Sequence, residues 1–129
     1  ELYQALDGKQ RKVALLDKRS RGERGIKTIQ TKGSTEGLEG LPVSDLAKDQ
    51  KGLFQKVLGD LLAPFRKKDA VEAMKLIQAN DMDKLHISYY KKENIGEDEV
   101  WDVWQVEGPK MVWYFRGKPH VHVWANIEA

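Results

Sequence analysis

The fold is decided by residues 98–127, which read DEVWDVWQVEGPKMVWYFRGKPHVHVWANI. β-branched and aromatic residues recur there with a period of two, and Gly108-Pro109-Lys110 and Gly117-Lys118-Pro119 interrupt the pattern. Such alternation is typical of β-strands, and glycine and proline clusters mark tight turns, which join antiparallel neighbours. We therefore predict three consecutive antiparallel strands, over Val100–Glu107, Met111–Arg116 and His120–Ile127.

A fourth strand is expected over Leu85–Tyr90, and upstream of Asp81 the hydrophobic period changes to about 3.6, which indicates helices. The main core helix should cover Leu46–Leu62, with Ser44 or Asp45 as its cap and Pro64 as its end. Two further helices are predicted, one over Ala70–Ala79 opened by Asp69 and Glu72, and a broken one over Glu1–Leu16 restarted by Asp7 and Gln10.

These patterns predict an α+β fold and a single domain over residues 1–129. The N-terminal helices should pack on one face of a C-terminal antiparallel meander of about four strands. Between them, residues 18–40 form a long, basic, glycine-rich loop with room for one short strand over Ile26–Gln30. From Lys9 to Lys32, both included, there are nine Lys and Arg residues, so this basic stretch is either a solvated loop or a weak anion-binding surface.

Composition excludes several classes of function. The 22 basic and 20 acidic residues leave a net charge of +2, which gives no global reason to expect a nucleic-acid partner. The chain has no cysteine, which excludes disulfides, thiol nucleophiles and thiolate metal sites. No run approaches the ~20 apolar residues that a membrane span requires. Motifs of the GxSxG, P-loop and HExxH types are absent as well, so whether the chain is an enzyme stays open.

Both faces of the predicted sheet carry aromatic residues. Alternation places Trp101 with Val103 and Gln105, and Trp104 on the opposite face. A sheet with helices on one side should have one wet face, so we expect the second face to be covered too. The cover could be another subunit of a homo-oligomer, a region missing upstream of Glu1, or the long loop. The alternative is an aromatic-lined ligand groove.

The candidate chemistry lies on the last strand. His120, His122 and Trp124 share one face, and the Cα atoms of the two histidines should be about 7 Å apart. Two imidazoles at this spacing can converge on one metal ion, with His86 as a possible third ligand. Copper or zinc would suit nitrogen ligands. The pair could instead be structural, or a metal-free catalytic or substrate-binding pair.

Two more residues are candidates for ligand binding together with Trp124. Tyr114 and Arg116 share a face one strand over, an arrangement suited to a small anion or carboxylate.

The chain also resembles a known family. Gly108-Pro109, the aromatic strand after it and His120-Val121-His122 are similar to the ending of the bacterial domain-of-unknown-function family numbered 3500. Gln10-Arg11 and Gly40-Leu41-Pro42 extend the similarity upstream, over nearly the whole chain, which would correspond to the C-terminal part of longer members. The resemblance implies no activity, but it implies an extracytoplasmic location, periplasmic or secreted, and marks Gly108, Pro109, His120 and His122 as a candidate site.

The sequence therefore favours an extracytoplasmic protein that binds a transition metal through His120 and His122. A metal-free structural or interaction module is the first alternative. A metal-dependent enzyme of unknown substrate is the second.

Overall fold

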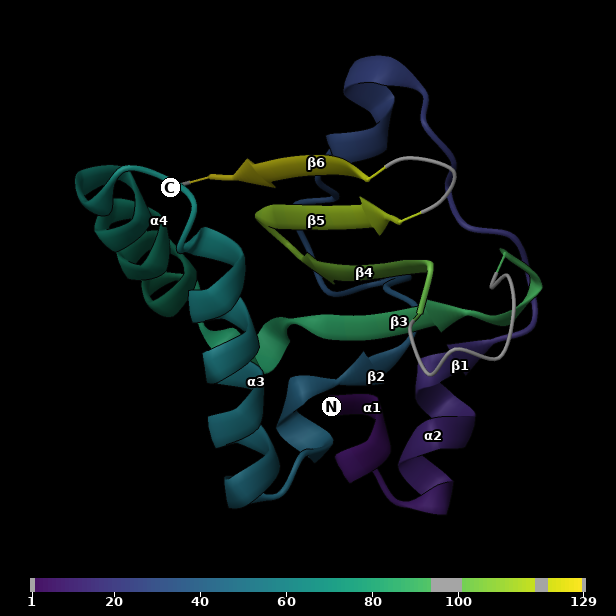
Figure 1. The fold of residues 1–129 in the computed structure, drawn as a ribbon. Helices are drawn as coiled ribbons and strands as arrows, with labels where there is room; N and C mark the ends of the chain where they lie inside the picture. The colour runs from purple at the N-terminus through teal and green to yellow at the C-terminus, as the bar shows by residue number, and fades with distance from the viewer. Residues whose placement is uncertain (1, 94–100, 118–120, 129) are drawn as a thin grey trace.

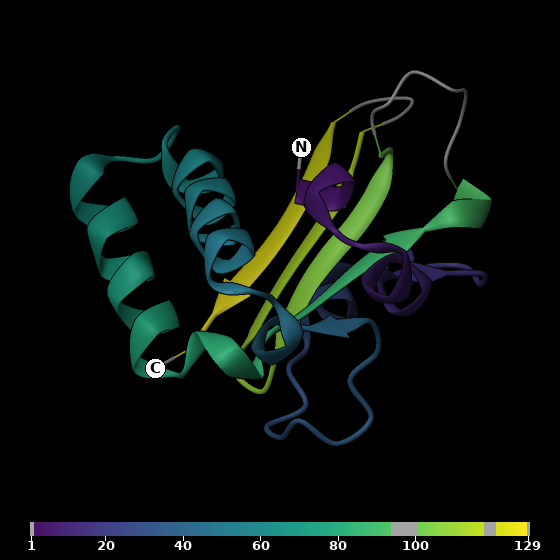
Figure 2. The same cartoon turned by 90° about the horizontal axis from the view of Figure 1, so that it is seen from below.

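The computed structural model describes residues 2–93, 101–117 and 121–128. A twisted sheet forms its middle layer, with helices against one face and a long irregular segment behind the other (Figures 1 and 2). The predicted α+β class is confirmed. None of the helices in the described part of the chain is long and apolar enough to cross a membrane.

The described elements follow one another in this order: α1 (Leu2–Ala5), α2 (Gly8–Ala14), β1 (Leu15–Leu16), the 3₁₀ turn η1 (Gly25–Ile29), β2 (Leu41–Pro42), η2 (Val43–Asp45), α3 (Lys48–Leu62), α4 (Lys67–Ala79), η3 (Met82–Lys84), β3 (His86–Tyr90), η4 (Lys91–Glu93), β4 (Val103–Gly108), β5 (Met111–Arg116) and β6 (His122–Ile127).

The sheet has the order β1-β3-β4-β5-β6, with β2 also paired to β3. From β3 to β6 the strands form the predicted antiparallel meander, since each pairs with the next in the chain. Two short strands were not predicted, because two-residue strands have no readable period. β1 lies parallel to one end of β3, and β2 lies antiparallel to its other end.

The broken N-terminal helix is confirmed. The Gln10 backbone N–H donates to the Asp7 carboxylate at 2.8 Å, and the Asp7 N–H donates to the Gln10 side chain at 2.9 Å. This reciprocal pair restarts the chain as α2. The expected helix over residues 1–16 ends early, however, because Leu15 and Leu16 are drawn into the sheet as β1.

The starts of α3 and α4 differ from the prediction. Ser44 and Asp45 belong to η2, and Ala47 is the N-cap of α3, with its N–H bonded to the Gln50 side chain at 2.8 Å. The next helix, α4, begins at Lys67, and Asp69 lies within its first turn, where it accepts from Arg66 Nε at 2.7 Å. A carboxylate in a first turn is favourable without being the cap, which is why the motif misplaced the start.

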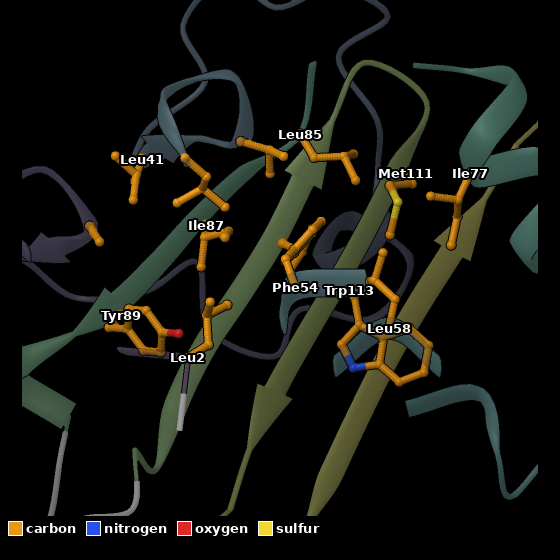
Figure 3. Close-up of a cluster of buried hydrophobic side chains, with 14 of the residues drawn as sticks. Leu2, Leu41, Phe54, Leu58, Ile77, Leu85, Ile87, Tyr89, Met111 and Trp113 are labelled. Atoms are coloured by element: carbon orange, nitrogen blue, oxygen red, sulfur yellow. The ribbon is translucent and has the colours of Figure 1, made fainter. Parts of the chain in front are cut away.

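The main core lies between the sheet and α3 (Figure 3). Phe54 and Leu58 of α3 and Ile77 of α4 meet Ile87, Val106 and Trp113 from β3, β4 and β5. On the other face a smaller core joins Tyr90, Val103, Val112 and Tyr114. Two cores confirm that both faces of the sheet are covered.

Two expected side-chain positions are wrong. Trp101 was placed with Val103, but it precedes β4 and packs on Tyr3 and Tyr89 at the helix face, where strand alternation does not apply. Strand alternation also puts Val121 and Val123 on the face opposite the histidines, where core positions are expected, yet they are 68% and 45% exposed. The helix layer contacts β6 at its C-terminal end, where Asn80 Nδ2, just after α4, donates to the carbonyl of Glu128, just after β6, at 2.7 Å.

Candidate functional site

The segment between β1 and β2, residues 17–40, crosses the whole face of the sheet that the helices leave uncovered. The segment starts beside one end of β3, where β1 ends, and returns to the other end of β3, where β2 begins. Between these points it reaches β6, where the Asn126 side chain donates to the Ile29 carbonyl at 3.1 Å. The cover of the second face is thus this loop. The strand expected over residues 26–30 is instead the 3₁₀ turn η1, which buries Thr28 against the sheet.

Arg21 is the deepest anchor of the loop. Its guanidinium donates to Gln105 Oε1 at 3.0 Å and to the Thr28 carbonyl at 2.7 Å, and one terminal nitrogen lies 2.8 Å from Glu107 Oε2. Gln105 and Glu107 are fully buried on β4. A buried carboxylate needs a compensating charge, and the ion pair with Arg21 supplies that charge to Glu107.

A second set of contacts, the Glu23 cluster, lies at the β5–β6 corner. It consists of Ser20, Glu23, Tyr114, Arg116, His122 and Trp124. His122 Nδ1 lies 2.8 and 2.9 Å from the two carboxylate oxygens of Glu23, and Arg116 Nε lies 3.3 Å from one of them. Arg116 also donates to the Tyr114 hydroxyl, which is 2.8 Å from Ser20 Oγ.

The four predicted residues Tyr114, Arg116, His122 and Trp124 are therefore brought together, around a carboxylate that sequence reasoning missed. The hydrogen bond from His122 lowers the pKa of the Glu23 carboxyl; burial opposes it, and Trp124 and Arg116 add to it. Glu23 is thus ionised at neutral pH. The available signal was that Glu23 is the one acidic residue between Lys18 and Lys32, in a stretch rich in lysine and arginine.

Of the other two predicted histidines, His86 does not join this cluster. His120 lies outside the described residues. His86 points to the same face of the sheet as His122, but at the diagonally opposite corner, three strands across and four residues along. Strand spacing and rise put their Cα atoms roughly 20 Å apart. His86 therefore cannot be the third ligand of an ion held by His122. In the described parts of the chain, no three His, Asp or Glu side chains are grouped to hold a metal ion.

The return of the loop is anchored by Glu39. The Tyr90 hydroxyl donates to Glu39 Oε1 at 2.6 Å, Lys18 forms an ion pair with the same carboxylate, and Ser88 donates to the Glu39 carbonyl at 3.2 Å. Burial works to raise the pKa of the Glu39 carboxyl, but the hydrogen bonds from Lys18 and Tyr90 outweigh it and lower the pKa. Gly40 follows at φ +94°, and a Cβ there would collide with the Ser88 hydroxyl and the Ile87 carbonyl.

A hollow of about 520 Å³ lies between the loop and the sheet. Five cations and two glutamates line it, and two of the cations are neutralised, Lys18 by Glu39 and Arg21 by Glu107. The segment is docked through Arg21, Thr28 and Glu39, while most of its other side chains remain exposed to solvent. Arg19, Lys27 and Lys32 leave the hollow positively charged, as the anion-binding alternative requires.

The comparisons with known proteins agree with the family seen in the sequence. No curated protein and no solved structure matches the chain significantly. The sequence model of the family described as protein of unknown function (DUF3500) matches residues 1–125, which is nearly the whole chain. The chain therefore belongs to the DUF3500 family.

Proposed function

We propose that this chain is an extracytoplasmic protein that binds one copper or zinc ion through Nε2 of His122, with His120 as a second ligand. The observation that carries the proposal is the short contact between His122 Nδ1 and the Glu23 carboxylate. The resemblance of the chain to a family with exported members supports the extracytoplasmic location.

The contact matters because it sets the tautomer of the imidazole. A neutral imidazole has one N–H and one lone-pair nitrogen, and a carboxylate at Nδ1 holds the proton there. Nε2 is then the nitrogen with the lone pair, which is the form a metal requires. Carboxylates that orient a ligand histidine in this way recur around metal sites and increase the basicity of the ligand.

A purely structural role for the same contact is the main alternative. Glu23 also forms an ion pair with Arg116, so the cluster fastens the loop to β5 and β6 whether or not a metal ion binds. The two interpretations differ in what the wild-type protein takes up. The metal site requires one bound ion, and its affinity should fall as the pH drops, because protons compete with the metal for the imidazole nitrogen.

Titration calorimetry with Cu²⁺ and Zn²⁺ tests the proposal. We expect one ion per chain, loss of more than 90% of the affinity in His122→Ala and in His120→Ala, and roughly tenfold weaker binding in Glu23→Gln, whose amide keeps the hydrogen bond but loses the charge. His86→Ala is the matched control and should bind as the wild type does. A wild type that binds neither ion above background would falsify the proposal, as would equal losses in His86→Ala and His122→Ala.

A further inference from the structure

A cleft of about 330 Å³ opens on the helix face of the sheet, opposite the Glu23 cluster. Its walls come from α1, α3, the start of β4 and the ends of β3 and β5, and among the residues that the structure describes none of the lining side chains carries a charge. Five of them are aromatic: Tyr3, Tyr89, Trp101, Trp104 and Phe115. Trp101, Trp104, Tyr3 and Phe115 are only partly buried, so the rings stand at the opening.

The rings are already arranged by contacts with one another. Trp104 and Phe115 stack at 5.1 Å with an interplanar angle of 19°. Tyr3 meets Tyr89 and Trp101 edge to face, at 5.0 and 4.8 Å. Each of these geometries is favourable for aromatic pairs. The walls are thus built before any ligand arrives, which lowers the entropic cost of binding.

The volume of the cleft indicates the size of the ligand that it can hold. A cavity of about 150 Å³ takes up benzene, so a cleft of twice that volume suits two fused rings. Ligand pockets begin at about 300 Å³.

The chemistry of the lining side chains further restricts the class of ligand. The described lining residues offer no charge to compensate an ionised ligand, and desolvating a charge is costly. A sugar would need several convergent hydrogen-bonding groups, whereas the polar side-chain groups of the described lining residues are tyrosine hydroxyls and indole N–H groups. Burial raises the pKa of Tyr89, so its hydroxyl stays protonated and can bond one polar group of a ligand.

We propose that this cleft is a binding site for a neutral, flat aromatic molecule of about two fused rings with one hydroxyl or N–H group. Trp104 and Phe115 supply a stacking wall, and Tyr3, Tyr89 and Trp101 surround the edge of the ligand. The site is independent of the metal proposed above, because it lies on the other face of the sheet.

The test uses 2-naphthol as the probe and its saturated counterpart 2-decalol as the shape control. Calorimetry should give 1:1 binding of 2-naphthol, at least tenfold tighter than that of 2-decalol, which cannot stack. In ¹H–¹⁵N spectra the indole N–H signals of Trp101 and Trp104 should move with 2-naphthol, while those of Trp113 and Trp124, outside the cleft, stay in place. Equal affinities for the two compounds, or shifts at Trp124 alone, would overturn the proposal.

Two substitutions complete the test. Val57→Trp on α3 puts a large side chain into the cleft and should abolish binding, whereas Val71→Trp, on the exposed face of α4, is the matched control and should leave it unchanged. Trp104→Ala removes the stacking wall without filling the cleft and should weaken binding at least tenfold, so the result does not depend on how well Val57→Trp folds. Self-association of the wild type that Val57→Trp abolishes would overturn the proposal, since a second copy would then occupy the cleft.

Discussion

At the scale of single residues, Arg21 is the side chain on which the second face of the sheet depends. It supplies donors to Gln105 and Thr28 and a charge to Glu107, which is 1% exposed. Lysine could replace the charge but not the planar fork of donors. Removal of the guanidinium leaves a buried carboxylate without a compensating charge, which strongly destabilises the folded state. Removal of one partner of a surface ion pair has a much smaller effect on stability.

We therefore predict that Arg21→Met lowers the free energy of unfolding by about 3 kcal/mol, measured by urea denaturation. Arg21→Lys should recover only part of the loss. The double variant Arg21→Met/Glu107→Met should be closer to the wild type than Arg21→Met alone, because no charge is then left buried. Arg66→Met is the matched control: its partner Asp69 is at the surface, and the loss should stay below ~1 kcal/mol. Similar losses in both arginine variants would contradict the role given to Arg21.

At the scale of elements, the sequence predicts well whatever has a hydrophobic period. The meander β3 to β6 and the helices α3 and α4 have one, and β5 begins and ends at the predicted residues. The two-residue strands β1 and β2 have none, and they form only because β3 offers them an unpaired edge. The docked path of residues 17–40 is likewise invisible, since polar contacts between residues far apart in the chain anchor it.

In the candidate site, too, local patterns are predictable from the sequence and contacts between distant residues are not. Alternation correctly puts His122 and Trp124 on one face, and next to Tyr114 and Arg116 once β5 and β6 pair. Relations across several strands depend on register, which is why His86 was grouped with a residue at the opposite corner. Glu23 and Arg21 come from the loop, and no local pattern shows where a loop side chain will be placed.

The return of the loop at Glu39 predicts a pH dependence. The pKa of this carboxyl is lowered in the folded protein, so the folded state holds fewer protons than the unfolded state near the ordinary value of 4.5. The stabilisation is fully present above pH 4.5 and is lost as the pH falls through the lower folded-state pKa. The free energy of unfolding should therefore fall more steeply below pH 4.5 in the wild type than in Glu39→Gln, in urea titrations at each pH. Glu72→Gln, at an exposed position of α4, should follow the wild-type curve. Parallel curves for wild type and Glu39→Gln would show that Glu39 does not anchor the loop.

At the scale of the whole molecule, the two faces of the sheet are held by different forces. The helix face has a large apolar core, built from α1, α3, α4 and four strands. The loop face has a core of four buried residues, and its cover is fastened mainly by hydrogen bonds and ion pairs of Arg21, Glu23 and Glu39. Regions with few buried apolar contacts open at a lower free energy than the core does. The loop face should therefore open while the sheet and helices remain folded.

Native-state hydrogen exchange measures this difference directly. The N–H of Gly33 donates to the Pro109 carbonyl at 2.8 Å, and that of Arg24 donates to Thr28 Oγ1 at 2.6 Å, so both amides report on the docked loop. We expect them to exchange through an opening of lower free energy than that of the paired amides of β4 and β5. Glu23→Gln should lower the free energy of loop opening and leave that of β4 and β5 nearly unchanged, because Glu23 bonds the loop to Arg116 and His122 but supports neither core. Glu72→Gln again serves as the control and should change neither. Equal opening free energies for Gly33 and for β4 would mean that loop and sheet unfold as one unit, and that the polar contacts of the second face are as strong as the apolar core of the first.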